Sequence, residues 1–271
     1  MLRRVLLISV FAVLAHSAYA ATIVPHRAIY DLEMKRMSQG ANLGNVAGRM
    51  AYEVTGSACD GWSVNFRLVN EYVYKDGPSR LTDMQSTSWE TGDGKEMKYN
   101  EKEFVDSKPA SEKRLVVSRA DKNGEGKGRI TLPKEVNFKL DAETVFPMQH
   151  QLRLMDEAAK GSTRDVSLIY DGSTDDKPVR AITAIGKRFE AGSYNDDTAN
   201  PVAAELKKFP SWPVSIGYYS TEDSNAETPV YQINFQMYEN GVSTDLVMDY
   251  GTFALVGKLS HLEILKPDVC E

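Results

Sequence analysis

Apolar and polar side chains alternate along most of the chain, and this constrains its fold more than any other feature of the sequence. The clearest runs cover residues 28–34, 50–54, 62–68 and 231–237. A period of two places every second side chain on the same face of an extended strand. The sequence therefore predicts strands that bury one face and expose the other.

Turn signals separate these runs. Asx-Gly pairs begin at Asp60, Asp76, Asp93, Asn123, Asp171 and Asn240. Asn240-Gly241 joins the run 231–237 to a second run at 242–250, which predicts a hairpin with a two-residue turn and positive φ at both turn residues. Regular turns of this kind favour an antiparallel sheet in which each strand follows its neighbour. About fourteen candidate strands result, and an open sheet of that size must curl, split or close.

The predicted fold class is therefore mainly β: a long antiparallel sheet curled into a spiral or a nearly closed barrel, with one prominent helix. That helix is predicted over about residues 147–160. Pro147 suits a first helical turn, and Gly161 suits the left-handed position after the last turn. Its apolar stripe consists of Met148, Leu152, Met155 and Ala159. A shorter helix is predicted at 202–208, within a long loop.

Residues 1–20 have the pattern of a signal peptide. Arg3 and Arg4 precede an apolar run at 5–14, and the small residues at 18–20 suit signal peptidase. An uncleaved anchor and a twin-arginine signal are the alternatives; the run is short for a membrane span, and the arginine pair lies early. Residues 21–271 are then expected to form a single domain in an exported protein.

Composition excludes several classes of protein. The chain has 271 residues, of which 42% are hydrophobic and 26% charged, as in globular proteins. Its formal net charge of −6 gives no overall attraction for nucleic acid. No stretch after the leader reaches 18 apolar residues, so stable insertion in a membrane is not expected.

A search for chemistry finds no assembled catalytic or metal-binding motif. Serine-hydrolase, zinc-protease and phosphate-loop patterns are all absent. The histidines after the leader, His26, His150 and His261, are far apart in sequence. His150 is the most interesting because it follows the helix start, but its spacing suggests no nucleophile or carboxylate partner. We therefore predict no catalytic residue, metal or cofactor.

Two groups of carboxylates have simpler explanations. Glu101 and Glu103 share one face of a predicted strand, as the two carboxylates of a glycosidase do, but a solvated strand face accounts for them. Asp171, Asp175 and Asp176 lack the ligand spacing of a calcium loop, and Asp171-Gly172 is first of all a turn.

Cys59 and Cys270 are the two cysteines of the chain. In an oxidising compartment, an even pair without metal-like spacing predicts a disulfide. Two free thiols are the alternative. The bridge would tie the tail of the chain to an early turn, which suits a sheet whose first and last parts meet.

An ordered set of short motifs resembles the EipB family of alphaproteobacterial periplasmic proteins. The motifs are HRAIYDL at 26–32, GSACDG at 56–61, VFPMQH at 145–150, YDGS at 170–173, WPV at 212–214 and YENGVS at 238–243, followed by Cys270. Each motif alone is weak, whereas the ordered set with both cysteines is specific. The resemblance extends over nearly the whole chain after the leader.

The resemblance implies a spiral-like antiparallel sheet with overlapping ends and a disulfide between them, similar in shape to the lipoprotein carriers LolA and LolB. It also implies a periplasmic, non-enzymatic protein that maintains the cell envelope. The expected partner is an envelope protein or a lipid acyl chain. A lipid or lipoprotein carrier and a hydrolase of an envelope polymer remain alternatives.

We predict that Cys59→Ser and Cys270→Ser each lower the melting temperature without changing the circular dichroism spectrum. The bridge acts mainly on the unfolded chain, and for so long a loop it contributes at most about 5 kcal/mol. Alkylation of unreduced protein from its native compartment, followed by mass spectrometry, tests the pairing. Two alkylatable thiols would contradict it.

Overall fold

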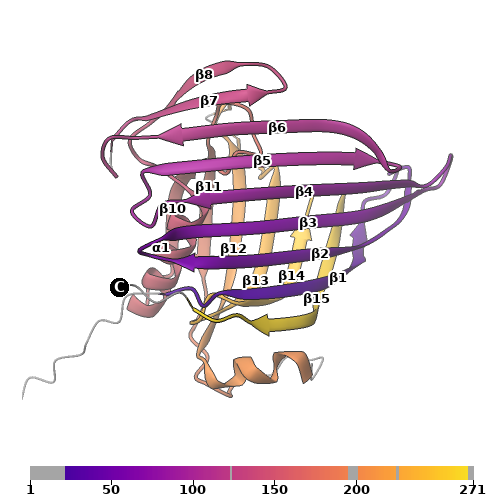
Figure 1. The fold of residues 1–271 in the computed structure, drawn as a ribbon. Helices are drawn as coiled ribbons and strands as arrows, with labels where there is room; N and C mark the ends of the chain where they lie inside the picture. Colours follow the sequence, from indigo (N-terminus) through magenta and orange to yellow (C-terminus); the bar gives the residue numbers. More distant parts are fainter. Residues whose placement is uncertain (1–21, 123, 195–200, 224–225, 268–271) are drawn as a thin grey trace, which may run out of the picture.

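The fifteen strands in the described part of the chain form one continuous sheet (Figure 1). The computed structural model describes residues 22–122, 124–194, 201–223 and 226–267. The strands are β1 His26–Met37, β2 Leu43–Ser57, β3 Gly61–Tyr74, β4 Arg80–Glu90, β5 Glu96–Val105, β6 Lys108–Ser118, β7 Gly126–Leu132, β8 Val136–Leu140, β9 Thr144–Val145, β10 Arg164–Ile169, β11 Val179–Ile185, β12 Ser211–Ser220, β13 Tyr231–Tyr238, β14 Ser243–Asp249 and β15 Phe253–Ile264. The predicted leader lies outside the described residues.

The strand order shows how the sheet curls. It runs from β8 through β1 to β15 and on to β9, so that the first and last strands lie side by side in its middle. Every neighbouring pair is antiparallel except the short β9–β10 pair. In Figure 1, β2–β5 cross in front of β11–β14. The two halves of the sheet, β1–β8 and β9–β15, therefore form facing layers. The predicted curled, nearly closed antiparallel sheet is confirmed.

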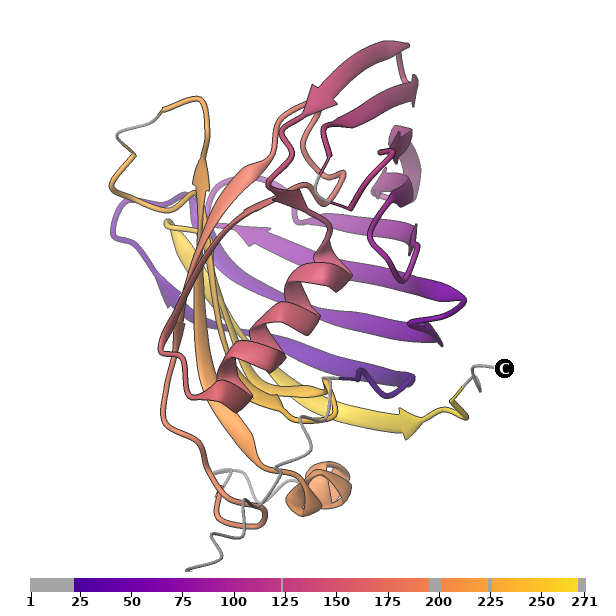
Figure 2. The ribbon, with the colours of Figure 1, turned by 90° about the vertical axis from the view of Figure 1, so that its left-hand side faces the viewer.

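Helix α1, Pro147–Lys160, lies between these two layers (Figure 2). Its buried residues Met148, Leu154 and Met155 belong to an apolar cluster that includes Trp62 of β3 and Ile216 of β12. The helix thus joins the inward faces of both halves. The described residues contain no helix that is long and apolar enough to cross a membrane.

The limits of α1 match the prediction, but its buried face is rotated. Gly161 takes the left-handed conformation, with φ 84°, and closes the helix as expected. Ala159 is exposed, whereas His150 and Ala158 are buried. The predicted stripe was wrong in part because apolar residues alone do not show that a polar His150 also faces the interior.

The predicted hairpin at Asn240-Gly241 is present, but its turn differs. Only Gly241 has a positive φ, at 86°. The Gly241 amide donates to Tyr238 O (2.9 Å), and the Tyr238 amide donates to Val242 O (2.9 Å). This is a three-residue loop closed by a left-handed glycine. The Asn240 side chain accepts a bond from the Val242 amide, which favours this turn.

The second predicted helix is the 3-10 helix η1, Pro201–Lys208. Its Leu206 is fully buried against residues of β1, β14 and β15. It therefore covers the end of the curl where the first and last strands meet.

A buried carboxyl group from the opposite layer caps α1. Phe146 stands at the N-cap position and offers no side-chain acceptor. Glu90, at the end of β4 and fully buried, accepts a hydrogen bond from the Met148 amide (3.1 Å). Burial raises the pKa of Glu90 to about 8, although hydrogen bonds from the Met148 and Gln149 amides act in the opposite direction. The structure thus places a largely protonated carboxyl group at the helix start near neutral pH.

We predict that, as the pH rises from about 4.5 to 8, the unfolding free energy of the wild type falls relative to that of Glu90→Gln. Within this window the unfolded chain loses the Glu90 proton while the folded protein retains it, so the unfolding free energy decreases as pH rises. The slope is at most about 1.4 kcal/mol per pH unit. Urea unfolding at several pH values measures it.

Glu90→Ala is the control for the hydrogen bond itself. It leaves the Met148 amide without an acceptor, and its unfolding free energy is expected to be about 1–2 kcal/mol lower than that of Glu90→Gln at every pH. Parallel stability curves for the wild type and Glu90→Gln across pH 4.5–8 would contradict the raised pKa.

Candidate functional site

The inward faces of the two halves enclose a cavity of about 330 Å³ beside α1. Most of its lining is aliphatic or aromatic. From β1, β2 and β3 the lining includes Tyr30, Met50, Tyr52 and Phe66; from β12 and β13 it includes Ile216, Tyr218, Ile233, Phe235 and Met237; and α1 adds Pro147, His150, Gln151 and Leu154. This volume lies near the lower end of the range for small-molecule pockets.

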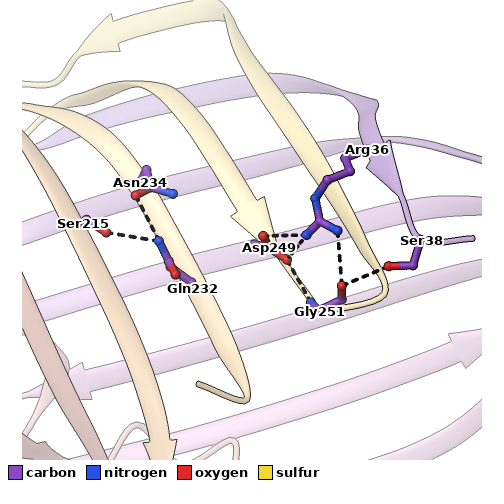
Figure 3. Close-up of polar contacts among 7 residues, drawn as sticks. All are labelled: Arg36, Ser38, Ser215, Gln232, Asn234, Asp249 and Gly251. Atoms are coloured by element: carbon purple, nitrogen blue, oxygen red, sulfur yellow. Dashed lines mark hydrogen bonds and ion pairs between the residues drawn. The ribbon is translucent and has the colours of Figure 1, made fainter. Parts of the chain in front are cut away.

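The alternation of apolar and polar residues in the strands places the apolar side chains on the cavity side. On β13, Ile233 and Phe235 face the cavity, while Gln232 and Asn234 alternate with them. The outward side of this half carries polar contacts (Figure 3): Gln232 donates to Ser215 Oγ (3.2 Å) and Asn234 Oδ1 (3.3 Å). One strand therefore has an apolar face toward the cavity and a polar face away from it.

A second outward contact in Figure 3 ties the two halves together. Arg36, near the end of β1, makes paired hydrogen bonds of 2.8 and 2.7 Å to the carboxylate of Asp249 at the end of β14. Asp249 also accepts from the Gly251 amide. Because β15 lies between β1 and β14, the ion pair reaches across one strand at the point where the two halves of the sheet meet.

Tyrosine hydroxyl groups supply much of the polarity in and beside the cavity. Burial raises the pKa values of Tyr52, Tyr218 and Tyr231, so these phenols stay neutral and able to donate hydrogen bonds. The rings of Tyr218 and Tyr231 stack with 5.7 Å between their centroids. These side chains form an apolar surface that also carries neutral hydrogen-bonding groups.

His26 is a neutral cavity residue. It is almost fully buried, and burial lowers the pKa of its imidazole, although a hydrogen bond with Val24 O acts in the opposite direction. Nδ1 lies 2.7 Å from that carbonyl oxygen, which assigns the ring proton to Nδ1. Nε2 is then an acceptor. The cavity thus contains one histidine nitrogen that can receive a hydrogen bond.

His150 has a carboxylate neighbour that the sequence analysis missed. Its Nε2 lies 3.7 Å from Oδ2 of Asp165 on β10, too far for a hydrogen bond. Asp165 also pairs with Arg153 (2.7 Å) and accepts a hydrogen bond from Ser167 (2.7 Å). Asp165 and Ser167 stand at positions of β10 where the alternation places buried side chains. Polar residues at such positions are the feature of the sequence that indicates a buried polar cluster.

These groups do not form an assembled nucleophile. Burial acts to raise the pKa of Asp165, but contacts with His150, Ser167 and Arg153 outweigh it and hold the value at about 2. The Ser167 hydroxyl donates to Asp165 and not to the imidazole, and a carboxylate with a pKa of about 2 is too weak a base to activate a serine. The arrangement anchors α1 to β10 through Arg153 and Asp165.

The other sequence candidates are dispersed. His261 is exposed on β15, and within the described ranges no three His, Cys, Asp or Glu side chains cluster as metal ligands would. Glu101 accepts a hydrogen bond from Tyr99, and Glu103 accepts one from Ser111. Asp171 forms the predicted turn by accepting from the Ser173 amide (2.9 Å), and its side chain also lines the cavity.

Cys59 lies in the turn between β2 and β3, whereas Cys270 lies outside the described residues. The strand register places the end of β2, which precedes Cys59, and the end of β15 at the same end of the sheet. His26 pairs with Val54 of β2 on one side and with Ile264 of β15 on the other. The pairing of the two cysteines stays a prediction.

Comparisons with known proteins agree with this architecture. The sequence profile of a family described as EipB-like matches residues 17–266. The cell envelope integrity protein EipB of Brucella abortus (strain 2308) is 37% identical over 255 residues, which cover 94% of this chain and 89% of that protein.

A crystal structure shares the fold. It is described as a beta-barrel-like protein of a domain of unknown function, DUF1849, from Brucella abortus. The match has a TM-score of 0.83 at 36% identity, and it covers 91% of this chain and all of the other.

Proposed function

The chain belongs to the EipB-like family, and on that premise we propose that it supports cell-envelope integrity by binding an apolar group of an envelope component in the cavity beside α1. The binding involves no catalytic turnover. The protein acts in the periplasm, to which the predicted signal peptide directs it. The envelope role rests on the name of the Brucella abortus relative.

The apolar cavity is the observation that carries the proposal. Close-packed interiors leave few voids larger than a water molecule. Here about 330 Å³ stays open between two layers whose inward side chains are mainly aromatic and aliphatic. An apolar guest that fills this space loses its contact with water, which is the dominant favourable contribution to such binding.

The size and polarity of the cavity limit its occupant. A volume of 330 Å³ suits a single acyl chain or an apolar peptide side-chain cluster better than an entire lipid with several chains. Neutral tyrosine hydroxyl groups can donate to a carbonyl group next to the apolar part, and Nε2 of His26 can accept from a hydroxyl group there. This favours a binding protein over a carrier of whole lipoproteins.

Catalysis by the residues around the cavity has little support. His150 faces an ionised carboxylate already held by Arg153, and Ser167 does not contact the imidazole. A hydrolase needs a nucleophile that is hydrogen-bonded to a base strong enough to take its proton, and the Asp165 carboxylate, with a pKa of about 2, is a weak base. The polymer-hydrolase alternative is therefore less well supported than binding.

We predict that Ile233→Trp abolishes protection of the envelope, because the larger ring fills the cavity. The matched control is Asn234→Trp, which places the same ring on the outward side of β13. Cells that lack the chromosomal gene and express each variant should differ: Asn234→Trp restores detergent resistance, whereas Ile233→Trp does not. Binding of a fluorescent fatty acid such as cis-parinaric acid should follow the same order.

Circular dichroism and protein abundance establish that both variants fold, since overpacking can cost about 1–3 kcal/mol. Full protection by a folded Ile233→Trp variant would contradict binding in the cavity. Lipid extraction and mass spectrometry of the protein purified from its native envelope identify the bound component.

We predict that His150→Ala, if it accumulates, keeps most of the envelope protection. Its side chain lines the cavity and packs against Asp165, so its loss should affect stability more than function. Detergent sensitivity and melting temperature are measured together. A stable His150→Ala protein that behaves like the gene deletion would contradict the non-catalytic proposal.

A further inference from the structure

A second cavity, of about 530 Å³, lies on the other side of α1 where the two ends of the sheet approach each other. Its lining comes from the segment after β6, from β9, and from α1, β10 and β11. It contains four basic side chains, Arg119, Lys122, Arg153 and Arg180. This concentration is unusual in a chain with a net charge of −6.

Arg119 is the central group of this cavity. It is only 7% exposed, and its guanidinium lies over the Phe146 ring, 4.7 Å from the centroid. Nη1 donates to the carbonyl oxygens of Thr144 (2.8 Å) and Lys122 (3.3 Å). Nη1 therefore bonds the segment after β6 to β9, whereas Nε and Nη2 have no hydrogen-bond partner among the described residues.

Other unpaired polar atoms surround the same space. Eight buried side-chain atoms lack a hydrogen-bond partner in the described residues, and four of them belong to residues that line this cavity. Besides the two atoms of Arg119, they are Nε of Arg180 and Oγ1 of Thr144. Buried polar groups are normally satisfied, so this concentration points to a missing acceptor.

The charges of the side chains that line this cavity also indicate a missing anion. Arg153 is compensated by Asp165 (2.7 Å). Arg119, Lys122 and Arg180 form no ion pair within the described residues, and Glu143 is the one carboxylate side chain in the lining. Three unpaired basic groups against one carboxylate leave a formal excess of two positive charges in the lining. A buried guanidinium cannot lose its proton, so its charge is compensated by an anion or by carbonyl oxygens, and in Arg119 only Nη1 has such carbonyl partners among the described residues.

We propose that this cavity binds a phosphate group, through the free nitrogens of Arg119 and Arg180, the hydroxyl of Thr144 and the ammonium of Lys122. A phosphate dianion matches the uncompensated charge and accepts several hydrogen bonds at once. Guanidinium groups bind its oxygens in a fork geometry. The inference is independent of the apolar cavity, because the two sites use different faces of α1 and different lining residues.

Isothermal titration calorimetry of the purified protein with inorganic phosphate and glycerol 3-phosphate tests the site, with acetate at equal ionic strength as the competing anion. We expect saturable binding of a phosphate compound and a rise in melting temperature that acetate does not reproduce. Absence of binding by both phosphate compounds, or equal binding of acetate, would overturn the proposal.

Matched variants locate the binding. Thr144→Val removes a hydroxyl that has no hydrogen-bond partner among the described residues, so it should fold normally and weaken phosphate binding several-fold. Thr183→Val is its control, because that hydroxyl is also buried and unpaired but does not line the cavity. Arg180→Gln should lower the affinity about tenfold, whereas Arg164→Gln, outside the cavity on β10, should not change it. Wild-type affinity in both Thr144→Val and Arg180→Gln would refute the assignment.

Vesicles containing phosphatidylglycerol distinguish two sources of the phosphate group. Flotation of the wild type with these vesicles, but not of Arg180→Gln, would identify a lipid headgroup. Binding of the small phosphate compounds without flotation would identify a free phosphate or phosphate ester. Flotation of both proteins alike, with no binding of the small compounds, would count against the site.

Discussion

The pairing of β1 with β15 is the interaction on which the rest of the structure depends. It joins residues near both ends of the chain and turns two sets of meandering strands into one sheet. Without it, β1 and β15 would each leave an unpaired edge, which proteins normally avoid. The same pairing brings the inward faces of the two halves opposite each other. Both the apolar core and the cavity beside α1 follow from this one contact between distant strands.

Helix α1 divides the interior that this pairing creates. His150 and Leu154 line the apolar cavity, while Gln149 and Arg153 line the basic one. The helix is fixed from both layers, since Glu90 of β4 accepts from its first turn and Asp165 of β10 pairs with Arg153. One element therefore separates two chemically different spaces, and a shift of the helix would change both.

Glu90 and Arg119 show two ways of placing an ionisable group in the interior. Burial raises the pKa of Glu90 to about 8, so protonation removes most of its charge near neutral pH. Burial also lowers the pKa of Arg119, yet a guanidinium stays charged at any physiological pH. A buried carboxyl group can be neutralised by solvent protons, whereas a buried guanidinium depends on an anion or on carbonyl oxygens. This difference explains why only one of the two groups suggests a ligand.

The sequence by itself determined that the chain forms a long series of extended segments, which face is buried in clearly alternating strands such as β1, and where α1 begins and ends. These features depend on local periodicity, on Pro147 and on the left-handed Gly161, so neighbouring residues suffice to specify them. Only the tertiary structure decided that β1 lies beside β15, that Asp165 faces His150, and that Arg119 reaches Thr144. Those contacts join residues remote in sequence, and their geometry depends on the register and curl of the whole sheet. The cavities belong to this second group, because an empty space is defined by side chains from strands that no local pattern relates.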